Sequence, residues 1–128
     1  MLMYFMNAVE LVPEVATRKA LNELKERLLE ALKDNLIKIV FFGSRARGLF
    51  EPDSDLDLLI LVKKKDHETA DRIFSIAQEI EDTILHKIAF SIHLYDMESY
   101  IKLKKVGSLL IKNIESEGLV VYERVNDN

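Results

Sequence analysis

Two short motifs in the middle of the chain combine residue types that could act together on a nucleotide. Gly43 and Ser44 directly follow an apolar run at residues 37–42, and Asp55 and Asp57 open a second apolar run. A turn of small residues after a strand offers backbone N–H groups to phosphate. Carboxylates spaced i, i+2 on a strand point to the same face, where they can hold a divalent cation. The spacing therefore indicates a phosphate-binding turn followed by a metal-binding pair.

Each motif has a plainer interpretation when it stands alone. An isolated Gly-Ser is usually a turn, and an isolated Asp-x-Asp is usually surface charge. Asp55 and Asp57, however, lead into a very apolar strand, where a carboxylate needs a strong reason to sit. Arg45 and Arg47 are candidates for additional phosphate binding, because guanidinium binds phosphate in a forked geometry. For Arg47, a solvated helix face explains the residue equally well.

The elements that would position these residues alternate along the chain. Apolar spacing predicts helices at residues 13–33, 66–85, 97–105 and 108–117, with a short helix at 44–49. Short apolar runs predict strands at 37–42, 55–62, 89–95 and 119–122. Asp66 is the expected N-cap of the second long helix, and Gly118 the expected C-terminal cap of the last. We expect an α+β fold, a small mixed sheet with helices packed on one face, in a single domain over residues 1–128.

Composition narrows the classes of function. The 128 residues are 48% hydrophobic and 31% charged, which is ordinary for one globular domain. A formal net charge of -4 makes nucleic acid an unlikely partner, since such a binder needs a basic face. The absence of cysteine fits a reducing cytoplasm. The apolar opening, Met1–Met6, lacks the basic leader of a signal peptide, and no run is long enough to span a membrane.

The central run resembles the signature of the DNA polymerase β-type nucleotidyltransferase superfamily. It is most similar to the small stand-alone members, the minimal nucleotidyltransferases that act as antitoxins beside HEPN-domain toxins. The matching residues are Gly43, Ser44, Arg45, Gly48, Asp53, Ser54, Asp55, Asp57 and Leu58. Residues 114–122 are similar to the usual ending of that group, so the core motif region covers residues 37–122. The resemblance implies a palm-like nucleotidyltransferase fold.

The resemblance also implies a chemistry for the central residues. In the family, the positions of Gly43 and Ser44 grip the β- and γ-phosphates of a nucleoside triphosphate. Those of Asp55 and Asp57 are catalytic and ligate one or two Mg²⁺ ions. The implied reaction transfers a nucleoside monophosphate, most simply AMP from ATP, to a hydroxyl. The implied acceptor is a small helical HEPN-type partner protein, on a residue such as tyrosine, and no membrane is involved.

The third strand departs from the family pattern. Active members usually carry a third carboxylate there, which completes the metal site and takes the proton from the attacking hydroxyl. Alignment of the strand places Ser91 at that position, and serine cannot serve as a carboxylate base. His93 shares the face of Ser91, so it could act as a base or a nitrogen ligand, or be a polar residue without either role. Asp96 has the wrong strand parity for that face.

Two rival interpretations remain beside the protein nucleotidyltransferase. A catalytically weakened module with the same fold would bind nucleotide and neutralise a partner by binding alone, which the missing third acid favours. Transfer to a small molecule or an RNA end is a weaker option, because the acidic net charge disfavours RNA. The base preference, the acceptor and the oligomeric state do not follow from the sequence.

Overall fold

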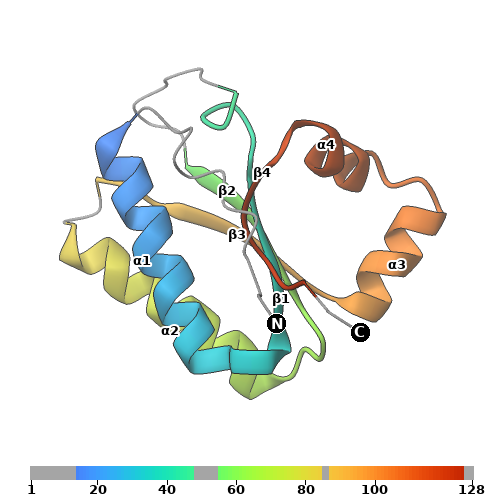
Figure 1. The fold of residues 1–128 in the computed structure, drawn as a ribbon, viewed down its shortest axis with the longest axis horizontal. Coiled ribbons are helices and arrows are strands. Elements are labelled where there is room, and N and C mark those ends of the chain that lie inside the picture. The colour runs from blue at the N-terminus through green and yellow to red at the C-terminus, as the bar shows by residue number, and fades with distance from the viewer. Residues whose placement is uncertain (1–13, 48–54, 85–86, 126–128) are drawn as a thin grey trace.

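Helices and strands alternate through the described part of the chain (Figure 1). A computed structural model describes residues 14–47, 55–84 and 87–125. The helices are α1 (Val15–Leu32), the 3₁₀ helix η2 (Lys33–Asn35), α2 (His67–Thr83), α3 (Met97–Lys105) and α4 (Leu109–Glu117). The strands are β1 (Leu36–Phe42), β2 (Leu56–Val62), β3 (Phe90–Asp96) and β4 (Leu119–Glu123). These bounds confirm the four long helices and the four strands that the sequence predicts.

The strands form one mixed sheet in the order β3-β2-β1-β4. β1 lies antiparallel to both β2 and β4, whereas β2 and β3 run parallel and are connected through α2. A parallel pair requires such a crossover connection. The α+β class and the mixed sheet are therefore confirmed.

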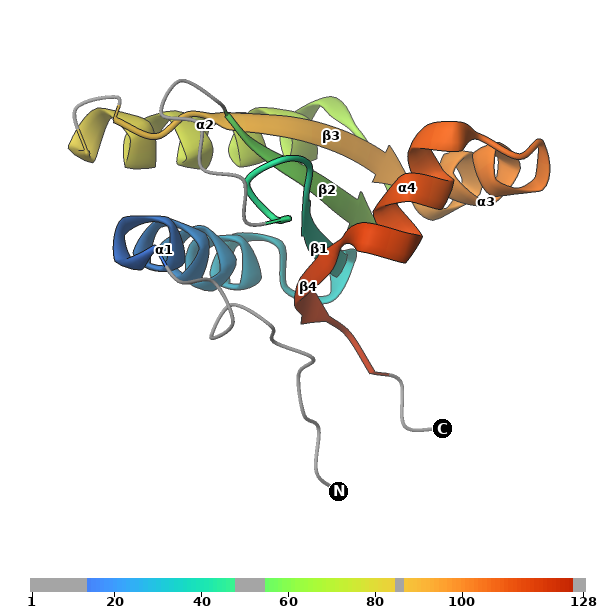
Figure 2. The same cartoon turned by 90° about the horizontal axis from the view of Figure 1, so that it is seen from above.

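Helices cover both faces of the sheet, so the expectation that they pack on one face is wrong. Leu58, Ile60 and Val62 of β2 belong to the core cluster that includes α1 and α2. Leu59 and Leu61 alternate with them and belong to a second cluster with residues of α3 and α4. Figure 2 shows the helix pairs on opposite sides of the strands. The physical reason is that β2 is apolar at both parities, so each face needs its own cover.

The first core cluster is the larger. Its helix side chains are almost fully buried and follow helical spacing, as in Leu21, Leu24 and Leu28 of α1 and Ile73 and Ile80 of α2. The second cluster is formed on the other face by Tyr100, Ile111 and Ile114 with Val40, Phe42, Leu59 and Leu61. β1 and β2 are thus held from both sides.

The helix starts follow the expected capping chemistry. The Asp66 side chain accepts a hydrogen bond from the Thr69 N–H at 2.8 Å, which confirms it as the N-cap of α2. Asp96 caps α3 in the same way through the Ser99 N–H, also at 2.8 Å. Gly118 does end α4, but its φ of -73° is not left-handed. Glycine is required there because a Cβ would collide with the Val40 side chain and the Ile114 carbonyl.

The described residues of the predicted short helix, 44–47, form turns instead. The remaining residues of that helix lie outside the described residues, as do the family matches Gly48, Asp53 and Ser54. Within the described residues, no helix is both long and apolar enough to cross a membrane.

Candidate active site

The two motifs meet at one end of the sheet. Phe42, the last residue of β1, pairs with Asp57 of β2, so the turn that follows β1 lies beside that carboxylate. Gly43 has a φ of +88°, a conformation that favours glycine. A Cβ on Gly43 would lie 3.1 Å from Asp57 Cγ and closer still to a carboxylate oxygen. Ser44 is the next residue of this turn.

The backbone after Gly43 closes into a tight turn. The Arg47 N–H donates to the carbonyl oxygens of Gly43 and Ser44, at 3.2 Å each. A glycine in the left-handed region followed by such a turn is the kind of backbone that can surround a phosphate oxygen. The turn lies beside Asp57, as the sequence predicts, and its binding of phosphate stays a prediction.

Ser91 lies directly beside Asp57 on the neighbouring strand. The parallel register of β2 and β3 pairs the two residues, and the Ser91 hydroxyl lowers the pKa of the Asp57 carboxyl. The alignment that puts Ser91 where active members carry an acid is thus consistent with the register. In this protein the position supplies a hydroxyl, which leaves Asp57 without a second carboxylate beside it on β3.

Asp57 is half-buried, and its surroundings disfavour its charged form. Burial is the largest influence and raises the pKa of the carboxyl above its usual range. His93 lowers the pKa, Asp55 raises it, and the Ser91 hydroxyl lowers it. A cation bound at the carboxylate would lower the pKa and favour the charged form of Asp57.

His93 lies on the same face as Asp57, one alternation further along β3. It pairs with Leu59, and its ring centroid is 5.4 Å from that of Phe42, at an interplanar angle of 56°. The register and this contact place the imidazole on the sheet face that carries Asp57. His93 is therefore placed for proton transfer or for a plain structural contact with Phe42, as the sequence left open. Asp96 lies on the other face and caps α3.

The two arginines after the turn contact other elements. Arg45 Nη2 donates to Glu14 Oε1 at 2.6 Å and to Thr17 Oγ1 at 3.2 Å, both at the start of α1. Arg47 Nη1 lies 3.2 Å from Glu117 Oε2 at the end of α4. Sequence reasoning missed these three partners, because no motif links side chains so far apart in the chain. The roles of both arginines in phosphate binding stay predictions.

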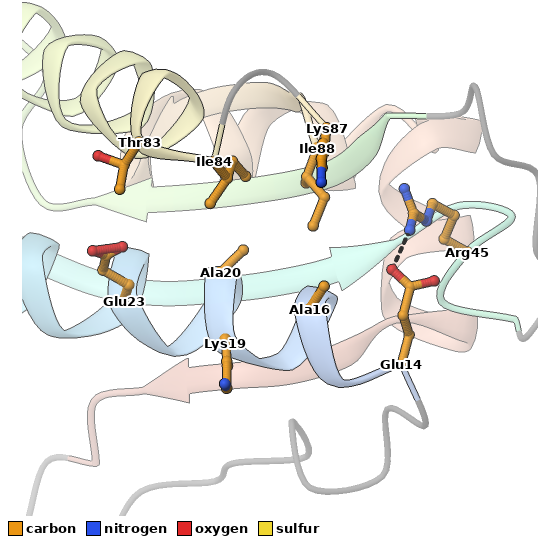
Figure 3. A pocket seen from close by; sticks show the side chains of 10 residues that line it. All are labelled: Glu14, Ala16, Lys19, Ala20, Glu23, Arg45, Thr83, Ile84, Lys87 and Ile88. Atoms are coloured by element: carbon orange, nitrogen blue, oxygen red, sulfur yellow. Dashed lines mark hydrogen bonds and ion pairs between the residues drawn. The ribbon is translucent and has the colours of Figure 1, made fainter.

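A cavity of about 560 Å³ lies on the opposite face of the sheet, between α1 and α2 (Figure 3). The residues that line it include Ala20 and Ile88, which belong to the first core cluster. Arg45 reaches its edge and is paired there with Glu14. The cavity is thus separated by the sheet from Asp57, and we assign the chemistry to the carboxylate face.

The donor set fits a magnesium–nucleotide complex better than a metal held by protein alone. Asp55 and Asp57 supply oxygen ligands, which Mg²⁺ prefers, and Mg²⁺ is commonly bound by one or two carboxylates plus substrate phosphates. Among the described residues, no group of three or more His, Cys, Asp or Glu side chains could hold a metal. Phosphate and water would have to complete the coordination.

Comparisons with known proteins show the family and the fold of the chain. Residues 19–121 match the model of the nucleotidyltransferase domain family. Two Methanocaldococcus jannaschii proteins, which carry the provisional name protein adenylyltransferase, are 29% and 28% identical to the chain over 113 and 104 residues. Those stretches cover 84% and 81% of this chain and 76% and 96% of the relatives. A third such protein is 46% identical over 44 residues, 34% of this chain and 44% of its own length.

Two solved structures share the fold. One is a toxin–antitoxin complex with AMP-PNP, at a TM-score of 0.52 and 20% identity. The other is a mutant MntA toxin–antitoxin complex, at a TM-score of 0.53 and 18% identity. Each match covers 80% of this chain and 73% of the other. With the family model matched over most of its length, the chain belongs to the nucleotidyltransferase domain family.

Proposed function

We propose that this protein transfers AMP from ATP to a hydroxyl of a partner protein. The observation that carries the proposal is the contact between the Gly43 turn and Asp57, which joins a phosphate-binding backbone to a metal-binding carboxylate. Family membership supports nucleotidyl transfer, and the names of the archaeal relatives support a protein acceptor. The fold neighbours are toxin–antitoxin complexes, so we propose a cytoplasmic antitoxin whose partner is a small helical toxin of HEPN type.

In the proposed reaction, an oxygen of the acceptor hydroxyl attacks the α-phosphorus of ATP. The new P–O bond forms as the bond to pyrophosphate breaks, and the hydroxyl proton leaves to a base. Gly43 and Ser44 hold the β- and γ-phosphates, while Asp55 and Asp57 hold the metal–phosphate complex. Bound Mg²⁺ would neutralise charge on the phosphates and align the leaving group. Positioning and charge neutralisation account for most of the catalysis in phosphoryl-type transfer.

The proton acceptor is the weakest part of the proposed machinery. Ser91 stands where a third carboxylate would receive the proton, and a hydroxyl is a poor base. His93 is on the same face and is the candidate base among the described residues. We therefore propose a slow reaction. A positioned general base typically contributes about 10²–10⁴-fold, so its loss slows transfer without abolishing it.

A second function is supported by the same serine. A protein with the intact phosphate turn and only two of three acids could bind ATP and mask its partner without modifying it. This alternative predicts neutralisation of the partner with no covalent change. It shares the nucleotide site, so binding measurements alone do not separate the two functions.

The deciding experiment incubates the purified protein with ATP, Mg²⁺ and a candidate HEPN-type partner, followed by intact-mass analysis of both chains. The enzyme proposal expects one or more adenylyl groups on the partner. A matched variant, Asp55→Asn with Asp57→Asn, should leave the partner unmodified and weaken metal-dependent ATP binding at least about tenfold, or ~1.4 kcal/mol. A partner that is neutralised yet unmodified by the wild type would leave only the binding module.

A further inference from the structure

Arg45 ties the phosphate turn to the start of α1. Although it directly follows Ser44, its guanidinium points across to the helix (Figure 3). Nη2 donates to a Glu14 oxygen at 2.6 Å and to the Thr17 hydroxyl at 3.2 Å. The Thr17 hydroxyl in turn donates to the same Glu14 oxygen. The three side chains therefore close a small hydrogen-bonded cluster.

Two of the three side chains in this cluster are shielded from water. The Arg45 side chain is 7% exposed and Thr17 is 2% exposed, whereas the Glu14 side chain is 30% exposed. Loss of Glu14 would therefore leave the buried guanidinium of Arg45 without its charged partner. The Arg47 side chain is 46% exposed and so is open to solvent beside Glu117. The two arginines of the turn thus differ in exposure, since the Arg45 side chain is buried and the Arg47 side chain is open to solvent.

The cluster holds one side of the turn that contains Ser44 to α1. Gly43 is fixed on one side by the pairing of β1 with β2, and Arg45 fixes the other side of the turn to α1. Ser44 stands between these two attachments. A phosphate-binding backbone gains affinity when it is already held in its binding geometry. Arg45 is the residue that can hold it from the helix side.

We propose that Arg45 is a positioning residue that orients the Gly43–Ser44 turn for ATP through Glu14 and Thr17, and does not itself bind phosphate. The proposal rests on the proposed function, because ATP is the ligand whose binding it would affect. It differs from the phosphate-binding role that guanidinium chemistry predicts for Arg45. Binding phosphate through Nη2 would require that nitrogen to leave its two partners on α1.

Glu14→Ala separates the two roles by the sign of its effect. If Arg45 positions the turn, loss of its carboxylate partner should raise the Kd and the KM for Mg-ATP about tenfold, or ~1.4 kcal/mol, with kcat at saturating ATP retained. If Arg45 binds phosphate, the same variant frees the guanidinium and should leave the Kd unchanged or lower it. Glu14 makes no side-chain capping bond in α1, so the variant removes no cap.

Three further variants make the outcome specific. Thr17→Ser keeps the hydroxyl and should keep the wild-type Kd, whereas Thr17→Val should raise it as Glu14→Ala does. Glu26→Ala, the matched control, removes an equal charge from an exposed position of α1 and should leave the Kd unchanged. Circular dichroism confirms that each variant is folded at the temperature of the calorimetric titration.

The titrations test the positioning role of Arg45 and the proposed function separately. An unchanged or lower Kd in Glu14→Ala, or an equal rise in Glu26→Ala, would overturn the positioning role of Arg45. A wild-type protein that gives no heat with Mg-ATP would instead refute the proposed function, whatever the variants do.

Discussion

Two separate restrictions act on Gly43, the residue at which the strand becomes the phosphate turn. Its φ of +88° lies in the region that L-residues rarely adopt, and a Cβ would collide with the Asp57 carboxylate. Gly107, between α3 and α4, has a similar φ of +76° but only ordinary contact distances around it. Alanine variants of Gly43 and Gly107 should share the backbone strain, and only the Gly43 variant adds the collision with Asp57. Comparing them therefore separates the two effects.

We predict that Gly43→Ala abolishes Mg-ATP binding, whereas Gly107→Ala leaves it unchanged. Both variants should lose about 1–2 kcal/mol of unfolding free energy from left-handed strain. Only the first displaces Asp57, so it should lose more. Urea unfolding and calorimetric titration measure the two effects. Equal behaviour of the two variants in the titration would mean that the close approach to Asp57 is irrelevant to binding.

Ser91→Asp tests whether the missing acid limits the reaction. Without metal, the new carboxylate lies beside Asp57 and should lower the melting temperature through like-charge repulsion. With Mg²⁺, the variant should be stabilised more than the wild type and should transfer AMP faster, because a positioned base adds up to about 10²–10⁴-fold. Ser91→Asn is the uncharged control of similar size. If the aspartate variant binds Mg²⁺ no better and reacts no faster than the asparagine variant, this position is not the acid site.

His93→Ala completes the residue-scale tests. If His93 receives the proton, the variant should lower kcat for AMP transfer while the Kd for Mg-ATP stays unchanged. The variant also removes the ring contact with Phe42. His93→Gln keeps a polar side chain there and controls for that loss. A wild-type kcat in His93→Gln would assign His93 a structural role.

At the scale of elements, α3 and α4 are held together by a phenol and a carboxylate. The Tyr100 hydroxyl donates to Glu115 at 2.6 Å, and Lys104 lies 3.1 Å from the same carboxylate. Burial first, and then the hydrogen bond to Glu115, raises the pKa of Tyr100 well above its usual value. The same hydrogen bond is the main reason that the pKa of Glu115 is lowered.

These shifts predict a pH window for the stability that Tyr100 contributes. A raised tyrosine pKa stabilises the fold below the unfolded value of about 10, and that contribution is lost as pH rises toward the folded pKa. A lowered glutamate pKa stabilises the fold above about 4.3, and that contribution is lost as pH falls through the folded pKa. Tyr100→Phe should therefore cost about 1 kcal/mol between these limits and less outside them. Urea unfolding across pH measures this difference in unfolding free energy between the wild type and Tyr100→Phe. In a Glu115→Gln background, the difference should no longer decrease at acid pH.

The element pattern was largely predictable because most signals are local. The start of β1 differs by one residue from the prediction, and Asp66 caps α2 as its side-chain chemistry suggests. The placement of α3 and α4 on the second face was not foreseen, although a signal was present. Leu59 and Leu61 are as apolar as their neighbours in β2, and a strand apolar at both parities is buried on both faces.

The site was predictable only where strand parity and spacing determine it. Ser91 and His93 could be placed relative to Asp57 because side chains alternate along a strand. The ion pair between Arg45 and Glu14 could not be predicted, because Glu14 lies before α1 and reaches Arg45 only through tertiary packing. The turn at residues 44–47 was predicted as helix because a phosphate turn is commonly continued by one.

At the scale of the whole molecule, the two core clusters share β1 and β2. Leu58 and Leu59 are adjacent residues that serve opposite cores, so neither helix pair can detach without exposing the strands. This arrangement supports the expectation of one domain. Since small single domains usually unfold in one step, loss of either cluster should unfold the other.

We predict that Leu24→Ala, in the α1/α2 core, and Ile114→Ala, in the α3/α4 core, each lower the unfolding free energy by about 2–5 kcal/mol. Both side chains are almost fully buried. Each variant should keep one transition, with fluorescence and far-ultraviolet circular dichroism giving the same midpoint. Two separated transitions in either variant would show that the helix pairs are independent units.

The placing of β1 between β2 and β4 also has a consequence for synthesis on the ribosome. One neighbour of β1 is the next strand of the chain, and the other is the last strand described. Until β4 has left the exit tunnel, β1 has an unpaired edge, and Gly118 has not yet packed against Val40. We therefore expect a nascent chain to acquire its nucleotide site late and all at once, with no partly competent form during translation.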